Sequence, residues 1–147
     1  MNQNAIQSAI PHREPMLLVD EISTLETDSI ICRKTFHEHE FFFQGHYPGH
    51  PLVPGVVLCE CAMQAGGVLL ANRIEGGSGV PVATRMNNVR FRKMVRPGDT
   101  IEIQVELQEQ VSQAFYLTAR VRCHDQIAMR MDFACTMAPV EKVADQD

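Results

Sequence analysis

Alternating apolar and polar residues in the second half of the chain predict an antiparallel sheet. Four such stretches follow one another, over residues 81–95, 100–111, 114–123 and 127–137. Residues suited to tight turns separate them, at Pro97-Gly98-Asp99, Ser112-Gln113 and His124-Asp125. We therefore expect four consecutive strands joined by short connections.

The first part of the chain predicts shorter elements. A short helix is expected over residues 4–9, before Pro11, and strands are expected over residues 16–22 and 29–36, with acidic turn residues between them. From residue 38 to residue 54 the prolines and glycines exclude regular structure. A long loop is therefore expected there.

One stretch between the two groups of strands has apolar residues at helical spacing. They are Val57, Leu58, Cys61, Ala62, Ala65, Val68 and Leu69. The helix is expected to start near Pro54, to end near Asn72 before Gly76-Gly77-Ser78-Gly79, and to be mostly buried. A helix that is apolar nearly all round needs to be enclosed, so the sequence predicts an α+β fold: an antiparallel sheet of about five to six strands around one long central helix.

Composition and charge set the limits of this picture. With 147 residues and 45% hydrophobic content, the chain can bury one core of ordinary size. We expect one domain over residues 1–139 and a charged, frayed tail over residues 140–147. The net charge of −5 is spread along the chain, so nothing at the level of the whole domain suggests binding of nucleic acid.

The five cysteines argue for a reducing compartment. They are odd in number and include no C-x-x-C pair, which disfavours a disulfide framework or a zinc ribbon. The first residues lack a basic stretch leading into an apolar run, and no window reaches about 18 uninterrupted apolar residues. A cytoplasmic protein with reduced thiols, without signal peptide or membrane span, is expected.

The segment from Gly45 to Gln64 contains the residue types of an acid–base site. His46 lies in a loop stiffened by prolines, and a neutral imidazole can act as a general base. Glu60 lies in the second turn of the apolar helix, where low-dielectric surroundings favour the protonated acid. Gly55, at the start of that helix, can present an unpaired N–H to a carbonyl oxygen.

These groups suit removal of a proton next to a carbonyl, with loss of a hydroxyl group from the neighbouring carbon. His46 would take the proton, Gly55 would stabilise the enolate-like charge, and Glu60 would protonate the departing hydroxyl. The sequence therefore predicts dehydration of a 3-hydroxyacyl compound. Gln64, four residues from Glu60 on the same helix face, is expected to bond Glu60 or a backbone group.

Other interpretations of these residues stay open. A histidine in a loop rich in proline and glycine is usually structural or exposed, and a glycine at a helix start needs no catalytic role. A metal cluster is a further alternative, but its spacing fits no zinc motif and we expect no metal. Its candidate ligands are His37, Glu38, His39, Glu40, His46 and His50.

The segment resembles the 3-hydroxyacyl-[acyl-carrier-protein] dehydratases of type II fatty acid synthesis, which have the hotdog fold. The family pattern is G-H-F-P-x-x-P-x-x-P-G-V-x-x-x-E-A-x-x-Q. It is matched by Gly45, His46, Pro48, Pro51, Pro54, Gly55, Val56, Glu60 and Gln64. Residues 11–20 and 89–99 resemble the family's P-H-R-x-P-x-L-L-V-D and A-R-F-R-x-x-V-x-P-G-D, and the matches extend from about Pro11 to Met137.

The resemblance implies a shared active site. Two hotdog sheets would join edge to edge in a homodimer, with His46 of one subunit facing Glu60 of the other, and members often assemble further into trimers of dimers. The substrate would arrive on the phosphopantetheine arm of acyl carrier protein and enter a tunnel along the dimer interface. No metal or redox cofactor is implied.

This sequence departs from the family pattern at three positions. Tyr47 replaces the usual phenylalanine and adds a hydroxyl beside the site, Cys61 stands where alanine is common, and Asn87 stands where many members have aspartate. The acid is Glu60 rather than an aspartate, which resembles the branch that only dehydrates. Acyl chain length and the pathway served do not follow from these residues.

A basic cluster suggests where the carrier protein docks. Arg90, Arg92, Lys93 and Arg96 form the only basic concentration in an acidic chain. A solvated strand face that balances nearby acids is one explanation. Docking of the acidic acyl carrier protein is the other, because electrostatic steering would speed association at low salt.

Two other function classes compete with dehydration. A hotdog thioesterase would use an acid and a helix N-terminus to activate water against the same carbonyl. A non-catalytic acyl-binding or scaffold subunit would need neither group. The His46 and Glu60 pair favours dehydration, because hydrolysis does not require a base aimed at the α-carbon.

Overall fold

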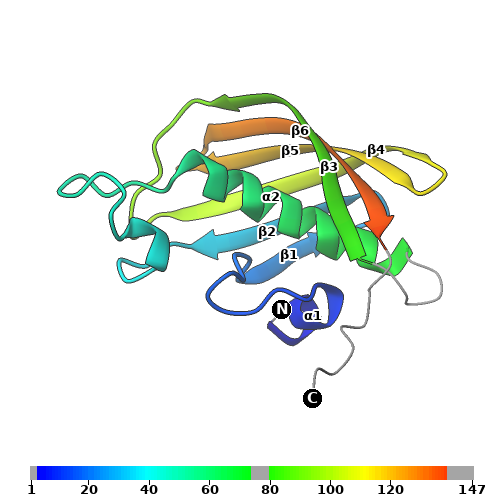
Figure 1. Ribbon diagram of the computed structural model, residues 1–147, viewed down its shortest axis with the longest axis horizontal. Helices are drawn as coiled ribbons and strands as arrows, with labels where there is room; N and C mark the ends of the chain where they lie inside the picture. The colour runs from blue at the N-terminus through cyan, green and yellow to red at the C-terminus, as the bar shows by residue number, and fades with distance from the viewer. Residues whose placement is uncertain (1–2, 74–79, 139–147) are drawn as a thin grey trace, which may run out of the picture.

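The computed structural model describes residues 3–73 and 80–138, and its architecture is one curved sheet around one long helix (Figure 1). The helices are α1 (Gln3–Ala9) and α2 (Gly55–Leu70), with single 3-10 turns η1 (Phe41–Phe43) and η2 (Ala71–Arg73). The strands are β1 (Glu21–Leu25), β2 (Ser29–Thr35), β3 (Val80–Phe91), β4 (Thr100–Val111), β5 (Ala114–Cys123) and β6 (Gln126–Ala138).

The six strands form a single antiparallel sheet in the order β1-β2-β4-β5-β6-β3. Strand β3 follows α2 in the chain but pairs with β6, so β1 and β3 are the two edges. The concave side of the sheet holds α2 (Figure 1). The predicted α+β fold, with about five to six strands around a central helix, is confirmed.

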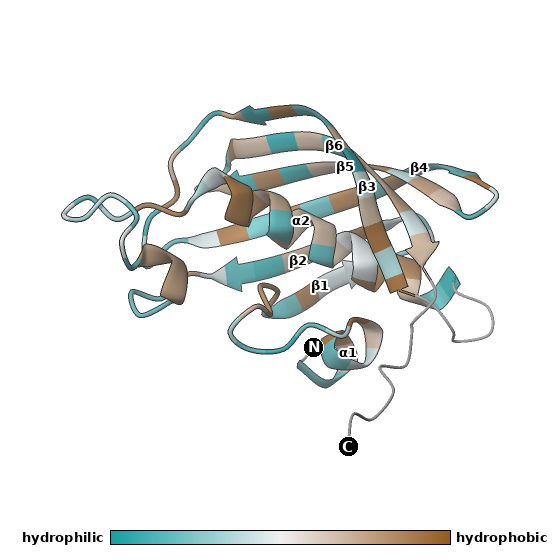
Figure 2. Ribbon diagram, viewed as in Figure 1, coloured by the Kyte–Doolittle hydropathy of each residue, from teal (hydrophilic) through white to brown (hydrophobic). Residues whose placement is uncertain are grey.

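Alternating side chains explain why the sheet curls around α2. On β4 and β5, buried residues such as Ile101, Ile103, Leu117 and Ala119 alternate with polar neighbours, and the ribbon coloured by hydropathy shows the two kinds along the strands (Figure 2). Because successive side chains point to opposite faces, one face of each strand is apolar. Burying that face against an apolar helix removes both surfaces from water. The expected strands over residues 100–111 and 114–123 have these bounds in the structure.

Most of α2 is buried, as its composition predicts. The stretch Gly55–Arg73 is long and apolar enough to cross a membrane by length and composition alone, but 61% of its apolar window is buried inside the protein. That burial is typical of a core helix. The buried residues of α2 are Leu58, Cys59, Cys61, Ala62, Gln64, Ala65, Gly66, Gly67, Val68, Leu69 and Leu70.

The five cysteines are free and buried in the core. Burial raises the pKa of the Cys32 thiol to about 12 and that of Cys135 to about 11. These thiols therefore stay protonated at neutral pH and act as small apolar side chains.

The expected strand over residues 16–22 is wrong for most of its length. Leu17, Leu18 and Val19 are buried, but the ladder with β2 begins only at Glu21. The apolar run is buried because it packs against the core, and a side chain of α2 replaces the neighbouring strand as its hydrogen-bonding partner. Here burial, rather than strand pairing, accounts for the sequence pattern.

The expected strand over residues 81–95 ends early, at Phe91. The N–H groups of Arg92 and Lys93 both point at the carbonyl of Ala128, at 2.8 and 3.4 Å, so the chain leaves the ladder there. Val95 is buried, and its carbonyl accepts a 2.7 Å hydrogen bond from the N–H of Val53 in the loop before α2. Two further expectations, the glycine-rich end over residues 76–79 and the frayed tail over residues 140–147, lie outside the described residues.

Gly66 allows α2 to lie close to the sheet. A Cβ atom added at this position would lie 2.9 Å from Cζ and 3.2 Å from Cε2 of the buried Phe133 ring on β6. Contacts that short force a displacement, so the helix and the ring fit each other only without the extra methyl group.

Replacing Gly66 by alanine should therefore destabilise the fold. The gain in helix propensity is about 1 kcal/mol, and we expect overpacking against Phe133 to exceed it, for a net loss on the order of 1 kcal/mol. Denaturant unfolding at one fixed protein concentration measures the change. In a Phe133→Leu background the same substitution should cost less; an equal loss in both backgrounds would contradict the packing explanation.

Candidate active site

Gly55 begins α2 and lies under an aromatic ring. The preceding Pro54 is extended, with φ −57° and ψ 137°, and the first turn starts with a 2.9 Å bond from the Val57 N–H to the Pro54 carbonyl. A Cβ atom at Gly55 would lie 2.7 Å from Cε1 of Phe91, at the end of β3. The N–H of Gly55 belongs to the first turn, whose amides have no partner within the helix.

In the loop before α2, the side chain of His46 contacts the backbone of the same loop. The Nδ1 atom of His46 lies 3.2 Å from the carbonyl oxygen of Leu52. A carbonyl only accepts, so Nδ1 carries the proton in this bond and Nε2 keeps its lone pair. Tyr47 adopts a positive φ of 50°, and its ring meets the imidazole edge-on at 4.6 Å between centroids. His46 therefore has one nitrogen anchored and the other available as a base.

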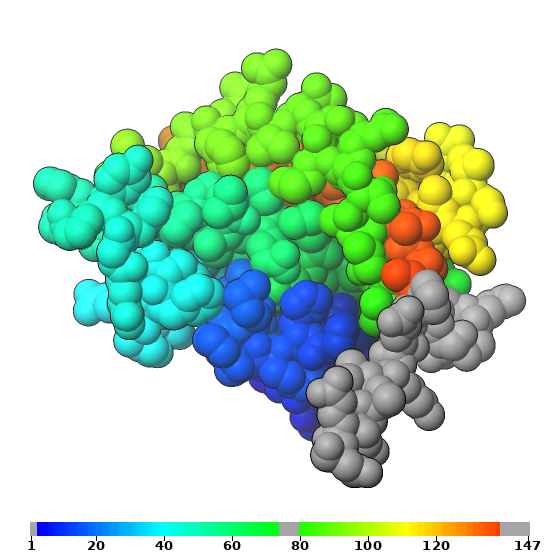
Figure 3. Space-filling model, in the orientation of Figure 1, coloured from blue at the N-terminus to red at the C-terminus, as the bar shows by residue number. Residues whose placement is uncertain are grey.

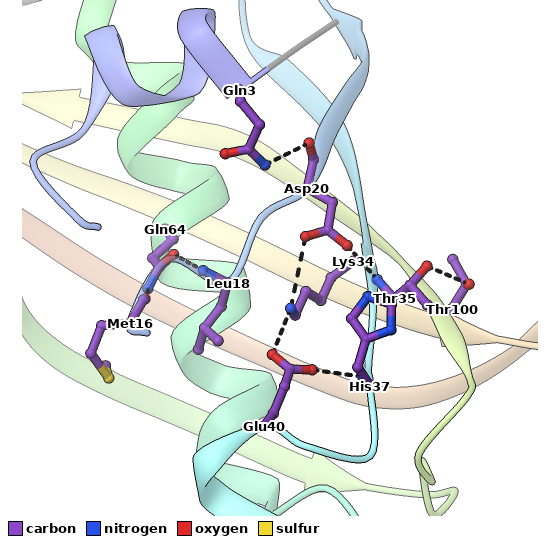
Figure 4. Close-up of polar contacts among 10 residues, drawn as sticks. All are labelled: Gln3, Met16, Leu18, Asp20, Lys34, Thr35, His37, Glu40, Gln64 and Thr100. Atoms are coloured by element: carbon purple, nitrogen blue, oxygen red, sulfur yellow. Dashed lines mark hydrogen bonds and ion pairs between the residues drawn. The ribbon is translucent and has the colours of Figure 1, made fainter. Parts of the chain in front are cut away.

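A buried ion cluster holds the start of this loop. Lys34 on β2 is only 4% exposed, and its Nζ lies 2.7 Å from Oε1 of Glu40 and 3.7 Å from Oδ1 of Asp20 (Figure 4). The second oxygen of Asp20 accepts the Thr35 N–H at 2.7 Å. A buried ammonium group needs such partners, and they fix Glu40 immediately before η1. This cluster is not among the sites predicted from the sequence.

Glu60 projects from the second turn of α2, with 29% of its side chain exposed. Its Oε2 atom accepts a 2.9 Å hydrogen bond from Nε2 of Gln64. Gln64 is 1% exposed, and its Oε1 accepts the Leu18 N–H at 2.8 Å while its Nε2 also donates to the Met16 carbonyl at 2.7 Å (Figure 4). These partners leave one possible orientation of the amide, so Gln64 presents an N–H to Glu60.

A histidine other than His46 faces Glu60. The Nε2 atom of His12 lies 3.7 Å from Oε2 of Glu60. His12 is not among the site residues predicted from the sequence, although it lies in the stretch resembling P-H-R-x-P-x-L-L-V-D. His12 and Glu60 are 48 positions apart in the sequence, so no periodic pattern links them. Its position could be found only from the family motif or from the fold.

His46 and Glu60 do not meet within one chain. Over the described residues, no hydrogen bond or ion pair joins them: His46 contacts Leu52 and Tyr47, and Glu60 contacts Gln64 and His12. Part of α2 is nevertheless open to solvent between β3 and the N-terminal segment, as the space-filling view shows (Figure 3). The predicted base and acid are thus both accessible but separate.

The predicted basic cluster is spread over two locations. Arg90 lies opposite Arg130 on β6, and Arg130 lies opposite Arg120 on β5, which makes a row of three like charges across the sheet. Arg96 lies in the loop after β3 and lines a pocket of about 810 Å³ together with His50. The remaining members differ: Arg92 is exposed, and Lys93 is half-buried and donates to Gln126 Oε1 at 3.2 Å.

One group of side chains in the described residues could hold a metal ion, and it differs from the candidate ligands named from the sequence. Asp99, Cys123 and His124 lie with their ligand atoms within 4.8 Å of one another. Desolvation works to raise the pKa of the Asp99 carboxyl, but hydrogen bonds from the Arg96 N–H and from His124 outweigh it and lower that pKa. These contacts already satisfy the carboxylate at the turn before β4, so the group has a structural explanation.

Comparison with solved structures identifies the fold. A chain of the dehydratase heterocomplex ApeI:P from Xenorhabdus doucetiae superposes with a TM-score of 0.78 and 19% identity, covering 90% of each chain. The Escherichia coli PaaI protein from the phenylacetic acid degradation operon gives a TM-score of 0.68 and 13% identity, covering 90% of this chain and 92% of that one. Both likenesses are of the hotdog fold, and at such identities they show the fold alone.

Comparison with known sequences is more specific. The model of the FabA-like domain matches residues 10–132. The 3-hydroxyacyl-[acyl-carrier-protein] dehydratase FabZ of Syntrophobacter fumaroxidans is 36% identical over 133 residues, which cover 90% of each chain. The protein of the same name from Clostridium perfringens is 40% identical over 107 residues, covering 73% of this chain and 77% of that one. The chain therefore belongs to the FabA-like family, and within it to the FabZ-type 3-hydroxyacyl-[acyl-carrier-protein] dehydratases.

Proposed function

We propose that this protein dehydrates (3R)-3-hydroxyacyl groups carried on acyl carrier protein to trans-2-enoyl thioesters, in fatty acid or related lipid synthesis. The proposal rests on the contacts of two side chains, one of which can accept a proton and the other donate one. His46 has its Nδ1 anchored on the Leu52 carbonyl, and Glu60 has one oxygen held by Gln64. Dehydratase relatives at 36–40% identity support the same reaction.

The reaction follows from the roles that these groups can take. Nε2 of His46 removes a proton from C2, the C2–H electrons form the C2=C3 double bond, and the C3–O bond breaks. Glu60 gives its proton to the departing hydroxyl, which leaves as water. During this step charge develops on the thioester carbonyl oxygen, which the Gly55 N–H and the positive end of α2 would stabilise.

Tyr47 and Gln64 act through the two reacting residues. The Tyr47 ring limits the rotation of the imidazole that it contacts, and Gln64 limits the rotation of the Glu60 carboxyl group. Both restrictions keep the reacting atoms in a productive geometry before substrate arrives.

A homodimer would bring the separate base and acid together. Within the part of the chain that the structure describes, β3 is an edge strand with unpaired backbone groups on one side, and large apolar side chains are exposed along and near it. Such an edge invites pairing with a second copy. The exposed side chains include Val56, Val82, Met86, Phe91 and Met94. Trimers of dimers are a further proposed assembly state. In this proposal residues 1–139 act as one hotdog domain. The buried thiols fit a cytoplasmic location.

Docking of acyl carrier protein is proposed at the basic residues Arg90, Arg92, Lys93 and Arg96. Arg90 precedes Phe91, whose ring covers Gly55, and Arg96 lines the pocket beside the loop that carries His46. A partner bound there would deliver its phosphopantetheine arm next to the proposed site. Like charges opposed across a sheet destabilise it, so the row Arg90, Arg130 and Arg120 favours an anionic partner.

The product distinguishes this function from thioester hydrolysis. With 3-hydroxyacyl thioesters of graded chain length, we expect enoyl formation without free thiol, because the base is aimed at a carbon-bound proton. Absorbance of the enoyl thioester and a thiol reagent follow both products in one reaction. Free thiol without enoyl product would make the protein a thioesterase, and neither product would indicate a non-catalytic subunit.

Mixing two inactive variants tests whether the site is shared between subunits. His46→Ala and Glu60→Gln should each lower kcat by about 10²- to 10⁴-fold, the usual contribution of general acid–base groups. After the two variants exchange subunits, heterodimers contain one intact site, so activity should recover to about a quarter of wild type. No recovery despite measured exchange would place both groups of one site in the same chain. Glu26→Gln, in a turn, serves as the control.

Charge reversal tests the docking surface. Arg92→Glu with Arg96→Glu should raise KM for the carrier-bound substrate by on the order of tenfold at low salt, and less at high salt, because steering is screened. KM for a small thioester analogue should not change. Arg33→Glu is the control for charge reversal elsewhere, because Arg33 is exposed on β2, near the edge of the sheet opposite β3. Equal effects on both substrates would contradict docking.

A further inference from the structure

Hydrogen bonds from the neighbouring Arg13 hold the backbone of His12 at the end of α1. The guanidinium group of Arg13 donates to the carbonyl of Ile10 at 3.0 Å, to that of His12 at 2.7 Å and to that of Gln7 at 3.1 Å. Arg13 thereby binds the last carbonyls of α1 and the backbone of His12 together. The neighbouring segment is tied to α2 as well, since Gln64 bonds the backbone at Met16 and Leu18.

The two ring nitrogens of His12 have different surroundings. Nε2 lies 3.7 Å from Oε2 of Glu60, whereas Nδ1 is buried and has no hydrogen-bonding partner among the described residues. A proton on Nδ1 would bury an unsatisfied N–H group and turn the Nε2 lone pair towards the lone pairs of Glu60. The tautomer with the proton on Nε2 avoids both costs and directs an N–H at the carboxyl group.

Two donors then converge on the same oxygen of Glu60. Gln64 donates to Oε2 at 2.9 Å, and the Nε2–H of His12 approaches the same atom. An oxygen that faces two N–H groups is a poor place for an acidic proton, because the proton would oppose both donors. When Glu60 is in its acid form, the proton is therefore held on Oε1.

We propose that His12 is a positioning residue that, together with Gln64, fixes the transferable proton of Glu60 on Oε1. The inference rests on the proposed role of Glu60 as the acid. When Glu60 releases its proton to the departing hydroxyl, negative charge builds up on the carboxyl group, and the attraction between a nearby N–H group and that carboxyl group grows with the charge. His12 thus stabilises the transition state more than the bound substrate, which raises kcat rather than affinity.

Three substitutions at His12 in the full-length protein separate this role from a structural one. Gln places an amide nitrogen near the position of Nε2, Asn places one near Nδ1, and Leu provides no donor. We expect His12→Asn and His12→Leu to lower kcat for a carrier-bound 3-hydroxyacyl substrate by about 10- to 100-fold, with KM nearly unchanged. His12→Gln should stay within a few-fold of wild type. Thermal unfolding of each variant checks the fold, and the Asn and Gln pair suffices if the Leu variant does not fold.

A double substitution tests whether His12 acts through Glu60. In the Glu60→Gln background, His12→Asn should cause no further loss, because there is no proton left to place. Losses that multiply, equal activity of the Asn and Gln variants, or a change confined to KM would each overturn the inference. If wild type dehydrates and Glu60→Gln is impaired while His12→Asn equals wild type, only the inference fails. If wild type forms no enoyl product, the proposed function itself fails.

Discussion

The buried amide of Gln64 is the constraint on which the site depends. Because the residue is almost inaccessible to water, each of its polar groups needs a partner inside the protein, and the fold supplies Leu18, Met16 and Glu60. The amide thus takes the place of a neighbouring strand for the N-terminal segment. It also restricts the rotamer of Glu60. One side chain links the path of the first twenty residues to the geometry of a carboxyl group on the central helix.

The second constraint is the incomplete enclosure of α2. Six strands cover most of the helix, but the sheet ends at β3, and part of α2 is open beside that edge. The fold therefore leaves apolar side chains exposed along and near β3, with part of α2 uncovered beside them. The exposed edge and the uncovered part of α2 have a common origin, because both result from the sheet ending at β3.

The sequence predicts those parts of the structure whose signal is periodic and local. The long helix, the strands over residues 100–111 and 114–123, and the neighbourhood of Glu60 and Gln64 follow from spacing along one element. Contacts between distant segments leave no such signal. The apolar run from Leu17 to Val19 looks like a strand in the sequence, but Leu18 bonds the side chain of Gln64, 46 positions away. His12 reaches Glu60 only through the folding of the N-terminal segment. Lys34 was missed because its pairing with Glu40 is set by the loop.

The contact between Phe91 and Gly55 also limits how this protein can vary. The ring lies where any side chain at position 55 would begin, so a larger residue there requires the ring of Phe91 to move or a smaller side chain at position 91. Two positions that are 36 residues apart are thus not free to change independently. The helix start that faces the proposed site and the edge strand proposed for assembly share one steric restraint, and substitutions that reshape the edge must preserve the space above the first amide of α2.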